Sequence, residues 1–369
     1  MSYYDVMSKY KEMSSTSIFK VSTADAAKAI SLSDINERQF AALLSEEAEP
    51  YLEKMAAKSR DITLRYFGKV IQLYTPLYLS NYCDNECLYC GFNASNSIER
   101  KALTVDEVKA EAEAISRTGL KHILVLTGES RVKSPLGYIK ECVSVLKERF
   151  SSVSVEIYPL SEAEYRELAE EGVDGLTVYQ EVYDEEIYRK MHPKGPKSDY
   201  RFRLDAPERG AKSGIRAINI GALLGLAEWR KEIFLAGLHA KYILEKFPDV
   251  EVALSLPRIR PQVASFRSAV TVSDKNIVQA ILALRLFLPR AGITISTREE
   301  GRFRENLIGL GVTKMSAGSV TCVGGHAGLT DEKKGIPQFE ISDPRGVDEI
   351  DRMLEAKGYQ AVFKDWMNI

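Results

Sequence analysis

Three of the chain's five cysteines are crowded into one short run, Cys83-Asp84-Asn85-Glu86-Cys87-Leu88-Tyr89-Cys90. Three thiolates at CxxxCxxC spacing can hold three corners of an iron–sulfur cube, whereas most such clusters take four cysteines. The run therefore predicts a cluster with one iron open to a substrate or cofactor. Zinc is the alternative, with Cys322 or one of the four histidines as fourth ligand. Zinc sites more often use paired CxxC turns, which this chain lacks.

Charge and composition exclude several classes of partner. The 369 residues carry 50 Lys plus Arg against 52 Asp plus Glu, so no basic surface for nucleic acid or an anionic membrane is expected. No apolar run approaches the roughly 20 residues that span a bilayer, and no secretion signal is evident at the N-terminus. An odd number of clustered cysteines does not suit a disulfide framework. We therefore expect a cytoplasmic globular protein.

The elements that must position the cysteines follow from an alternation of β-branched and amphipathic segments. Strands are expected at 73–79, 122–126, 153–157, 176–179, 217–220, 252–256, 293–296 and 313–316, with helices at 104–119, 161–172, 201–213, 229–246, 274–288 and 301–310. Strands separated by helix-length crossovers favour a parallel sheet covered by helices. Eight of them predict an α/β fold of the (β/α)8 barrel type. An open doubly wound sheet would need a glycine-rich turn after the first strand, and none is found.

Three regions are expected along the chain. Residues 1–68 are rich in Ala, Ser, Lys and Glu at helical spacing, which predicts an N-terminal helical extension. Residues 69–318 form the barrel. Residues 319–369, with a terminal helix at 348–357, form a C-terminal capping segment that covers the barrel.

Glycines and carboxylates stand where the expected strands end. Gly128 and Glu129 follow the strand at 122–126, Glu181 follows the strand at 176–179, and Gly221 and Gly225 follow the strand at 217–220. In a barrel, the loops after the strands carry the chemistry. Glycine lets a backbone approach a ligand closely, and a carboxylate suits an ammonium group. The strand ends therefore predict a ligand site beside the cysteine loop.

Together with the cysteine loop, these segments resemble the radical S-adenosylmethionine superfamily. The resemblance implies a [4Fe–4S] cluster on Cys83, Cys87 and Cys90, with S-adenosyl-L-methionine bound at its open iron. Residues that would border the cofactor are Tyr89, Gly128, Glu129, Glu181, Gly221 and Gly225. Either Arg203 or Arg209 would neutralise the methionine carboxylate. An iron–sulfur electron carrier would need a fourth cysteine, and a zinc hydrolase would need paired histidines at strand ends.

Further segments narrow the resemblance to aromatic-amino-acid lyases within this superfamily. They are Pro76–Asn81, Tyr89–Asn96, Val178–Glu181, 257–261 and Ser296–Glu299. The greatest similarity is to the tyrosine lyases of anaerobic thiamine (thiazole) biosynthesis. The related lyases of [FeFe]-hydrogenase maturation share the stretch Met191–Pro196, but carry further C-terminal cysteines for a second cluster, and the last 47 residues here have none. A tryptophan-specific relative is not excluded by spacing.

The resemblance implies cleavage of the Cα–Cβ bond of L-tyrosine to 2-iminoacetate (dehydroglycine) and p-cresol, with 5′-deoxyadenosine and methionine as co-products. A low-potential donor, flavodoxin or ferredoxin, would supply electrons. Thiazole synthase would be a further partner.

Tyrosine also needs a cation for its carboxylate and a group for its phenol proton. Arg298 follows the strand at 293–296, and a guanidinium pairs with a carboxylate through two hydrogen bonds. Ser296 would add a hydroxyl donor, and Arg258 and Arg260 are second choices for the cation. An ion pair of Arg298 with Glu299 or Glu300 is the structural alternative. Glu156 and Glu181 are candidates for the proton.

Overall fold

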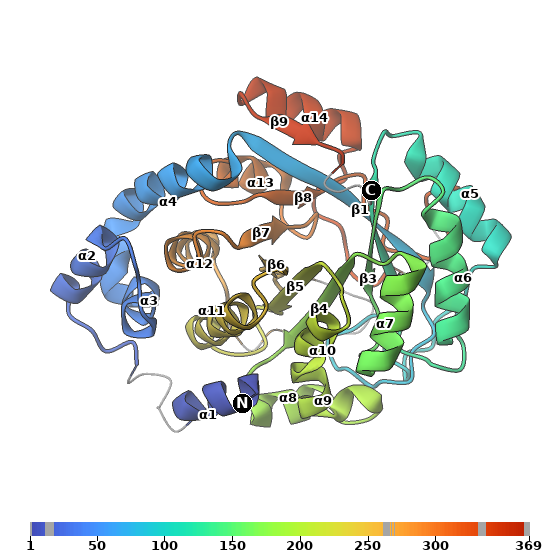
Figure 1. The fold of residues 1–369 in the computed structure, drawn as a ribbon, viewed down its shortest axis with the longest axis horizontal. Coiled ribbons are helices and arrows are strands. Elements are labelled where there is room, and N and C mark those ends of the chain that lie inside the picture. Colours follow the sequence, from blue (N-terminus) through green and yellow to red (C-terminus); the bar gives the residue numbers. More distant parts are fainter. Residues whose placement is uncertain are drawn as a thin grey trace.

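The computed structural model describes residues 2–11, 18–260, 266, 268, 270–330 and 337–364. Eight parallel strands form a closed barrel: β1 (Val70–Ser80), β2 (His122–Thr127), β3 (Ser152–Glu156), β4 (Gly175–Glu181), β5 (Ala217–Ala222), β6 (Glu251–Ser255), β7 (Gly292–Ile295) and β8 (Lys314–Ser316). Each strand pairs with the next along the chain, and pairing of β1 with both β8 and β2 closes the ring. The predicted (β/α)8 barrel is confirmed (Figure 1).

Helices surround the barrel: α5 (Val105–Ser116), α6 (Leu136–Leu146), α7 (Glu162–Glu171), α8 (Glu185–Met191), α9 (Tyr200–Leu204), α10 (Ala206–Lys212), α11 (Trp229–Lys246), α12 (Asp274–Phe287) and α13 (Gly301–Leu307). Several begin at capping boxes, such as Thr104 with Glu107 and Ser161 with Glu164. In each box, two side chains bond two backbone N–H groups that the helix leaves unpaired. The expected single helix at 201–213 is wrong. Two helices stand there instead, because α9 ends at Leu204 and α10 begins after Asp205. Pro207 lies in the first turn of α10, where proline is tolerated.

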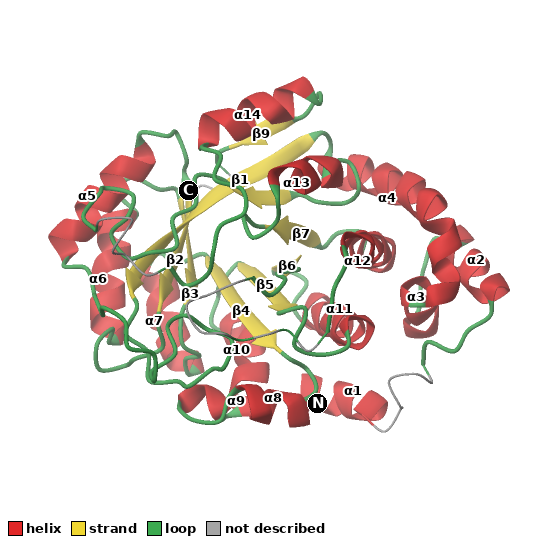
Figure 2. Cartoon of the chain, turned by 180° about the vertical axis from the view of Figure 1, so that it is seen from behind, coloured by secondary structure: helices red, strands yellow, loops and turns green. Residues whose placement is uncertain are grey.

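The N-terminal helices α1 (Tyr3–Lys11), α2 (Thr23–Ser31), α3 (Glu37–Leu44) and α4 (Leu52–Phe67) pack outside α11 and α12 (Figure 2). Phe40 of α3 stacks on Phe287 with ring centroids 4.1 Å apart and also contacts Phe234. A Cβ at Gly237 would come within 2.5 Å of the Phe40 ring, so glycine permits this close approach. Tyr3 donates a hydrogen bond to the carbonyl of Leu235.

The C-terminal region contacts the barrel in two places, at its C-terminal mouth and beside the first residues of β1. Residues 337–346 cross the C-terminal mouth of the barrel, where Gln338 and Phe339 line its cavities. Helix α14 (Val347–Ala356) agrees with the expected terminal helix and leads to β9 (Gln360–Val362), which was not predicted. β9 pairs with the first residues of β1. No helix in the described part of the chain is long and apolar enough to cross a membrane.

Candidate active site

The cysteine loop follows β1 and is held by backbone hydrogen bonds to two other segments. The Asp84 N–H donates to the Glu129 carbonyl (3.0 Å), and the Glu86 N–H donates to the Lys194 carbonyl (3.1 Å). Gly128 makes the first contact possible, because a Cβ there would lie 2.3 Å from the Tyr82 carbonyl oxygen. Gly128, predicted to lie near the cofactor, is therefore also needed for the cysteine loop to pack against the end of β2.

Cys83, Cys87 and Cys90 line one cavity at the C-terminal mouth of the barrel. Burial raises the pKa of Cys90 to about 11 and the pKa of Cys87 further, and the neighbouring thiols act in the same direction. The amide groups of Asn85 and Gln338 face the sulfurs of Cys83 and Cys90 at 3.7 and 4.0 Å. Buried thiols of this kind lose their protons when they bind metal.

This arrangement fits a cluster rather than a single zinc ion. Cys142 is buried in α6 near Tyr138, and Cys322 is buried but does not line the cavity. Three thiols therefore face the cavity, which fits three protein ligands and leaves one iron open.

Two carboxylates and two cations face the thiols across the cavity. The Arg203 guanidinium donates to Glu129 (2.8 Å), Lys197 donates to Glu181 (2.8 Å), and the Asn85 amide donates to Glu129 (2.9 Å). Burial opposes ionisation of both carboxyl groups, yet the two cations hold their pKa values below the usual range. The predicted residues Glu129, Glu181 and Arg203 are brought together. Lys197 was missed, although it directly follows the stretch Met191–Pro196.

Glu181 has an unusual backbone at the end of β4. Its φ of 67° lies in the left-handed region, the single such case among the described non-glycine residues. The pairing of β4 with β5 also shifts register between Tyr179 and Glu181. A bulge of this kind redirects a side chain, and strained backbone clusters at functional sites. The strand end is thus shaped to turn the Glu181 carboxylate toward Lys197.

A neighbouring cavity lies deeper in the barrel and shares with the first one the residues Glu156, Tyr179, Pro257, Arg298, Gln338 and Phe339. The Arg298 guanidinium lies 3.4 Å from the centroid of the Phe339 ring, and no carboxylate in the described sequence is paired with it. Ser296 lines this cavity. Burial, together with the Glu181 carboxylate, raises the pKa of Glu156 to about 7, although Arg298 acts in the opposite direction.

The alternative ion pair of Arg298 with Glu299 does not form. Glu299 is 1% exposed and bonds Arg258 (2.9 Å) and Arg260 (3.2 Å). Arg258 does not line either cavity, whereas Arg260 lines the one beside the cysteines. Arg298 is therefore the cation best placed for a carboxylate ligand.

The remaining candidates lie apart from the cavities or contribute through packing. Arg209 donates to the carbonyls of Leu160 and Phe202 and lines neither cavity, so Arg203 is the better placed of the two arginines. A Cβ at Gly221 would lie 2.3 Å from the Ser255 carbonyl, and Gly225 has a φ of +112°, so both require glycine.

Tyr89 lines the cysteine cavity, but its phenol is engaged elsewhere. Its hydroxyl lies 2.8 Å from His192 Nε2. Burial lowers the pKa of His192 to about 3, so the ring is neutral. Because His192 Nδ1 faces the Tyr188 carbonyl at 2.8 Å, Nδ1 donates there and Nε2 accepts from Tyr89. The ring of Tyr89 is thereby fixed against the cysteines.

Comparison with known proteins agrees with this geometry. Residues 77–235 match the family model described as the radical SAM superfamily, and residues 255–360 match the biotin and thiamin synthesis associated domain. The chain is 38% identical to the 2-iminoacetate synthase of Escherichia coli over 93% of this chain and 90% of that protein. It is 29% identical to the 3-methylornithine synthase of Methanosarcina barkeri over 72% of this chain and 74% of that one.

Solved structures show the same barrel. A crystal structure of HydG, a maturase of the [FeFe]-hydrogenase, superposes with a TM-score of 0.88 at 34% identity, covering 97% of this chain and 80% of the maturase. The HydG structure from Carboxydothermus hydrogenoformans gives 0.84 at 31% identity, with 98% and 82% covered. On this evidence the chain belongs to the 2-iminoacetate synthase family of the radical SAM superfamily.

Proposed function

We propose that this protein is a radical S-adenosylmethionine lyase that cleaves L-tyrosine between Cα and Cβ, giving 2-iminoacetate and p-cresol. The observation that carries the proposal is the placement of Arg298. Arg298 lines both the cavity that holds the three thiols and the neighbouring cavity. No carboxylate of the described residues forms an ion pair with it, and its guanidinium packs on the Phe339 ring. A guanidinium in that position suits the carboxylate of an amino-acid substrate. The similarity to 2-iminoacetate synthase supports tyrosine as that amino acid.

The family implies a [4Fe–4S] cluster and S-adenosylmethionine, and the residues present fit both groups. Cys83, Cys87 and Cys90 would hold the cluster. Glu129 and Glu181 would accept hydrogen bonds from the ammonium and ribose hydroxyls, while Arg203 would face the methionine carboxylate. When bound, the two groups supply the 5′-deoxyadenosyl radical that the reaction needs.

The chain's own residues position the substrate and handle one proton. Arg298 and Ser296 would bind the substrate carboxylate, which fixes the amine relative to the cysteine cavity. Glu156, with its pKa near 7, would accept the phenol proton. Phe339 and Tyr179 line the cavity between these groups and would exclude water from it.

Several further assignments belong to the same proposal. A flavodoxin or ferredoxin would deliver the low-potential electron, and thiazole synthase would receive the imino acid in thiamine biosynthesis. A cytoplasmic location suits five cysteines that form no disulfide. Residues 1–68, 69–318 and 319–369 would serve as helical extension, barrel and capping segment.

A product assay tests the function. Anaerobically reconstituted protein is incubated with dithionite, S-adenosylmethionine and either tyrosine or tryptophan, and p-cresol, glyoxylate and 5′-deoxyadenosine are quantified. We expect p-cresol from tyrosine and no cleavage of tryptophan; cleavage of tryptophan alone would contradict the proposal.

Iron and sulfide analysis of the same protein distinguishes the proposed function from that of the hydrogenase-maturation lyases, which carry a second cluster. One cluster gives about four irons per chain. An iron count of about eight per chain would indicate a second cluster. That result would favour the maturase function instead.

A further inference from the structure

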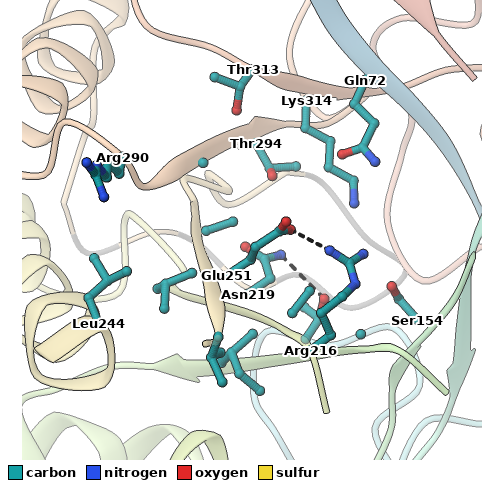
Figure 3. Close-up of a pocket in the computed structure, with 18 of the residues that line it drawn as sticks. Gln72, Ser154, Arg216, Asn219, Leu244, Glu251, Arg290, Thr294, Thr313 and Lys314 are labelled. Atoms are coloured by element: carbon teal, nitrogen blue, oxygen red, sulfur yellow. Dashed lines mark hydrogen bonds and ion pairs between the residues drawn. The ribbon is translucent and has the colours of Figure 1, made fainter. Parts of the chain in front are cut away.

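The polar side chains at the two mouths of the barrel differ in what they face. At the mouth where the strands begin, charged groups face one another, and Figure 3 shows Arg216 paired there with Glu251 (2.8 Å). At the opposite mouth, Gln338 reaches between Tyr78 of β1 and the thiol of Cys90. A polar side chain from the C-terminal region therefore faces one of the three cysteines directly.

The orientation of the Gln338 amide follows from its two partners. The Tyr78 hydroxyl donates to Gln338 Oε1 at 2.8 Å, and Gln338 Nε2 lies 4.0 Å from Cys90 Sγ. A thiolate bound to iron can only accept a hydrogen bond, whereas a glutamine amide offers two N–H donors and one acceptor oxygen. The N–H side of the amide must therefore face the sulfur, which leaves the oxygen for Tyr78.

The backbone around Gln338 lies close to the cysteine loop. A Cβ at Gly91, the residue after Cys90, would come within 2.8 Å of the Gln338 carbonyl oxygen, so glycine permits this contact. The Gln338 N–H donates to the Thr321 carbonyl, and the Thr321 hydroxyl donates to the Phe339 carbonyl, both at 3.1 Å. The segment that carries the amide is thus held from both sides.

A second amide faces the cysteines, but it makes other contacts as well. Asn85 Nδ2 lies 3.7 Å from Cys83 Sγ and also donates to Glu129, while Asn85 Oδ1 accepts from the Lys197 N–H. A change at Asn85 would therefore disturb several groups of the site together. Within the part of the chain that the structure describes, the Gln338 side chain bonds Tyr78 and Cys90 alone, so its effect on the sulfur can be measured separately.

A hydrogen-bond donor beside a cluster sulfur acts on the reduction potential of the cluster. Hydrogen bonds to the sulfurs are among the features that set this potential. Reduction adds one electron to the cluster and its thiolates, so a donor stabilises the reduced state more than the oxidised state. An amide N–H that faces a thiolate ligand therefore raises the potential.

We propose that Gln338 is a positioning residue whose amide, oriented by Tyr78, donates to the Cys90 sulfur and makes the cluster easier to reduce. The inference rests on the proposed function, which places the cluster on Cys90. Phe339, the next residue, lies 3.4 Å from the Arg298 guanidinium. One short segment of the C-terminal region therefore contacts both a ligand of the cluster and the arginine assigned to the substrate.

The reduction potential tests this role without turnover. EPR-monitored potentiometry is carried out on reconstituted protein in the absence of S-adenosylmethionine and tyrosine. Gln338→Met removes the N–H and keeps a side chain of similar length. The equilibrium constant of one-electron reduction should fall about tenfold, which corresponds to a potential lower by about 59 mV. The matched control is Gln360→Met, at an exposed glutamine of β9, which should retain the wild-type potential.

The variant Gln338→Glu separates the hydrogen bond from packing. Glutamate has the shape of glutamine, and its carboxylate can still accept from Tyr78, but at alkaline pH it faces Cys90 with a negative charge. The potential should therefore be lower in Gln338→Glu than in Gln338→Met. If Gln338 served packing alone, the order would be reversed, because the isosteric glutamate would disturb the structure less.

The variant Tyr78→Phe leaves Gln338 in place and removes the hydroxyl that orients its amide. The potential should fall in the same direction as in Gln338→Met, by a smaller amount. An unchanged potential in Tyr78→Phe would overturn the orienting role of Tyr78.

Equal potentials in the wild type and both Gln338 variants, with about four irons per chain in each, would overturn the proposal. The reversed order of the two variants would do the same. Because neither S-adenosylmethionine nor tyrosine is present, such a failure is separable from failure of the proposed function, which p-cresol formation reports.

Discussion

Arg298 is the residue on which substrate binding depends most directly. Its guanidinium stacks on Phe339, and the nearby Glu299 is already bonded to Arg258 and Arg260. Removing a cation that pairs with a desolvated carboxylate should cost about 2–5 kcal/mol. Arg298→Ala should therefore lose p-cresol while still forming 5′-deoxyadenosine slowly, because the radical then forms without a positioned amine.

The ratio of p-cresol to 5′-deoxyadenosine measures this effect. Arg298→Lys should recover part of the ratio, since an ammonium cannot form the paired hydrogen bonds of a guanidinium. Arg166→Ala, which removes a partner from the exposed pair with Glu162, is the matched control. A wild-type ratio in Arg298→Ala would move the carboxylate to Arg260.

Glu156 should give the reaction its pH dependence. Its pKa of about 7, raised from 4.5 by burial and by Glu181, means that the carboxylate is formed as pH rises through 7. If it accepts the phenol proton, p-cresol formation should rise over the same range. Glu156→Gln should lose this inflection. A profile identical to wild type would assign the proton to another group.

The contribution of the Glu156 carboxyl group to stability falls as pH rises, whereas its contribution to activity should increase. The folded chain binds this proton more tightly than the unfolded chain, so its contribution to stability is present below pH 4.5 and is lost as pH rises through 7. Glu156→Gln should therefore raise the melting temperature more at pH 8 than at pH 5. Calorimetry at the two values checks this.

Residue chemistry was predictable where it is local in sequence and was missed where distant segments converge. The cysteine spacing, Glu129 and Glu181 were found because each stands alone as a pattern at a strand end. Lys197 was missed because its approach to Glu181 depends on how residues 191–197 fold over the cysteine loop. Gln338 lies 248 positions from Cys90, and no local pattern joins them.

At the scale of elements, the end of β4 combines a register shift with left-handed backbone at Glu181. A β-carbon in this conformation costs about 1–2 kcal/mol. Glu181→Gly and Glu181→Ala both remove the carboxylate. The difference between their free energies of unfolding therefore measures the cost of a β-carbon at this backbone conformation. We expect the glycine variant to be more stable by about 1 kcal/mol in urea unfolding. Equal stabilities would show that the strand end relaxes.

Element prediction succeeded where periodicity is strong. The helix expected at 229–246 coincides with α11, and all eight barrel strands lie within a few residues of their predicted positions. The helix at 201–213 failed because Asp205 and Pro207 interrupt it. β9 has three residues and is stabilised by pairing with β1, so its own sequence carries too short a pattern to indicate a strand.

At the scale of the whole molecule, a charge cluster joins the segment at residues 342–345 to the barrel. Asp343 bonds Arg304, which is fully buried, and Arg345 at 2.8 Å. The N–H groups of Ser342 and Asp343 also donate to the Thr297 carbonyl, directly before Arg298. The cluster therefore fixes the segment that carries Gln338 and Phe339 against the loop that carries Arg298.

Removal of the Asp343 carboxylate should loosen the contact between the segment that carries Phe339 and the loop that carries Arg298. Substrate positioning should be impaired as a consequence. Asp343→Ala leaves the Arg304 charge buried and unpaired, which should cost about 3–5 kcal/mol of stability. Glu162→Ala, which breaks an exposed pair, should change stability by less than about 1 kcal/mol. Hydrogen exchange should quicken in 337–345, and p-cresol per 5′-deoxyadenosine should fall because Phe339 no longer holds Arg298. Faster exchange with an unchanged product ratio would separate the segment from catalysis and restrict its role to stability.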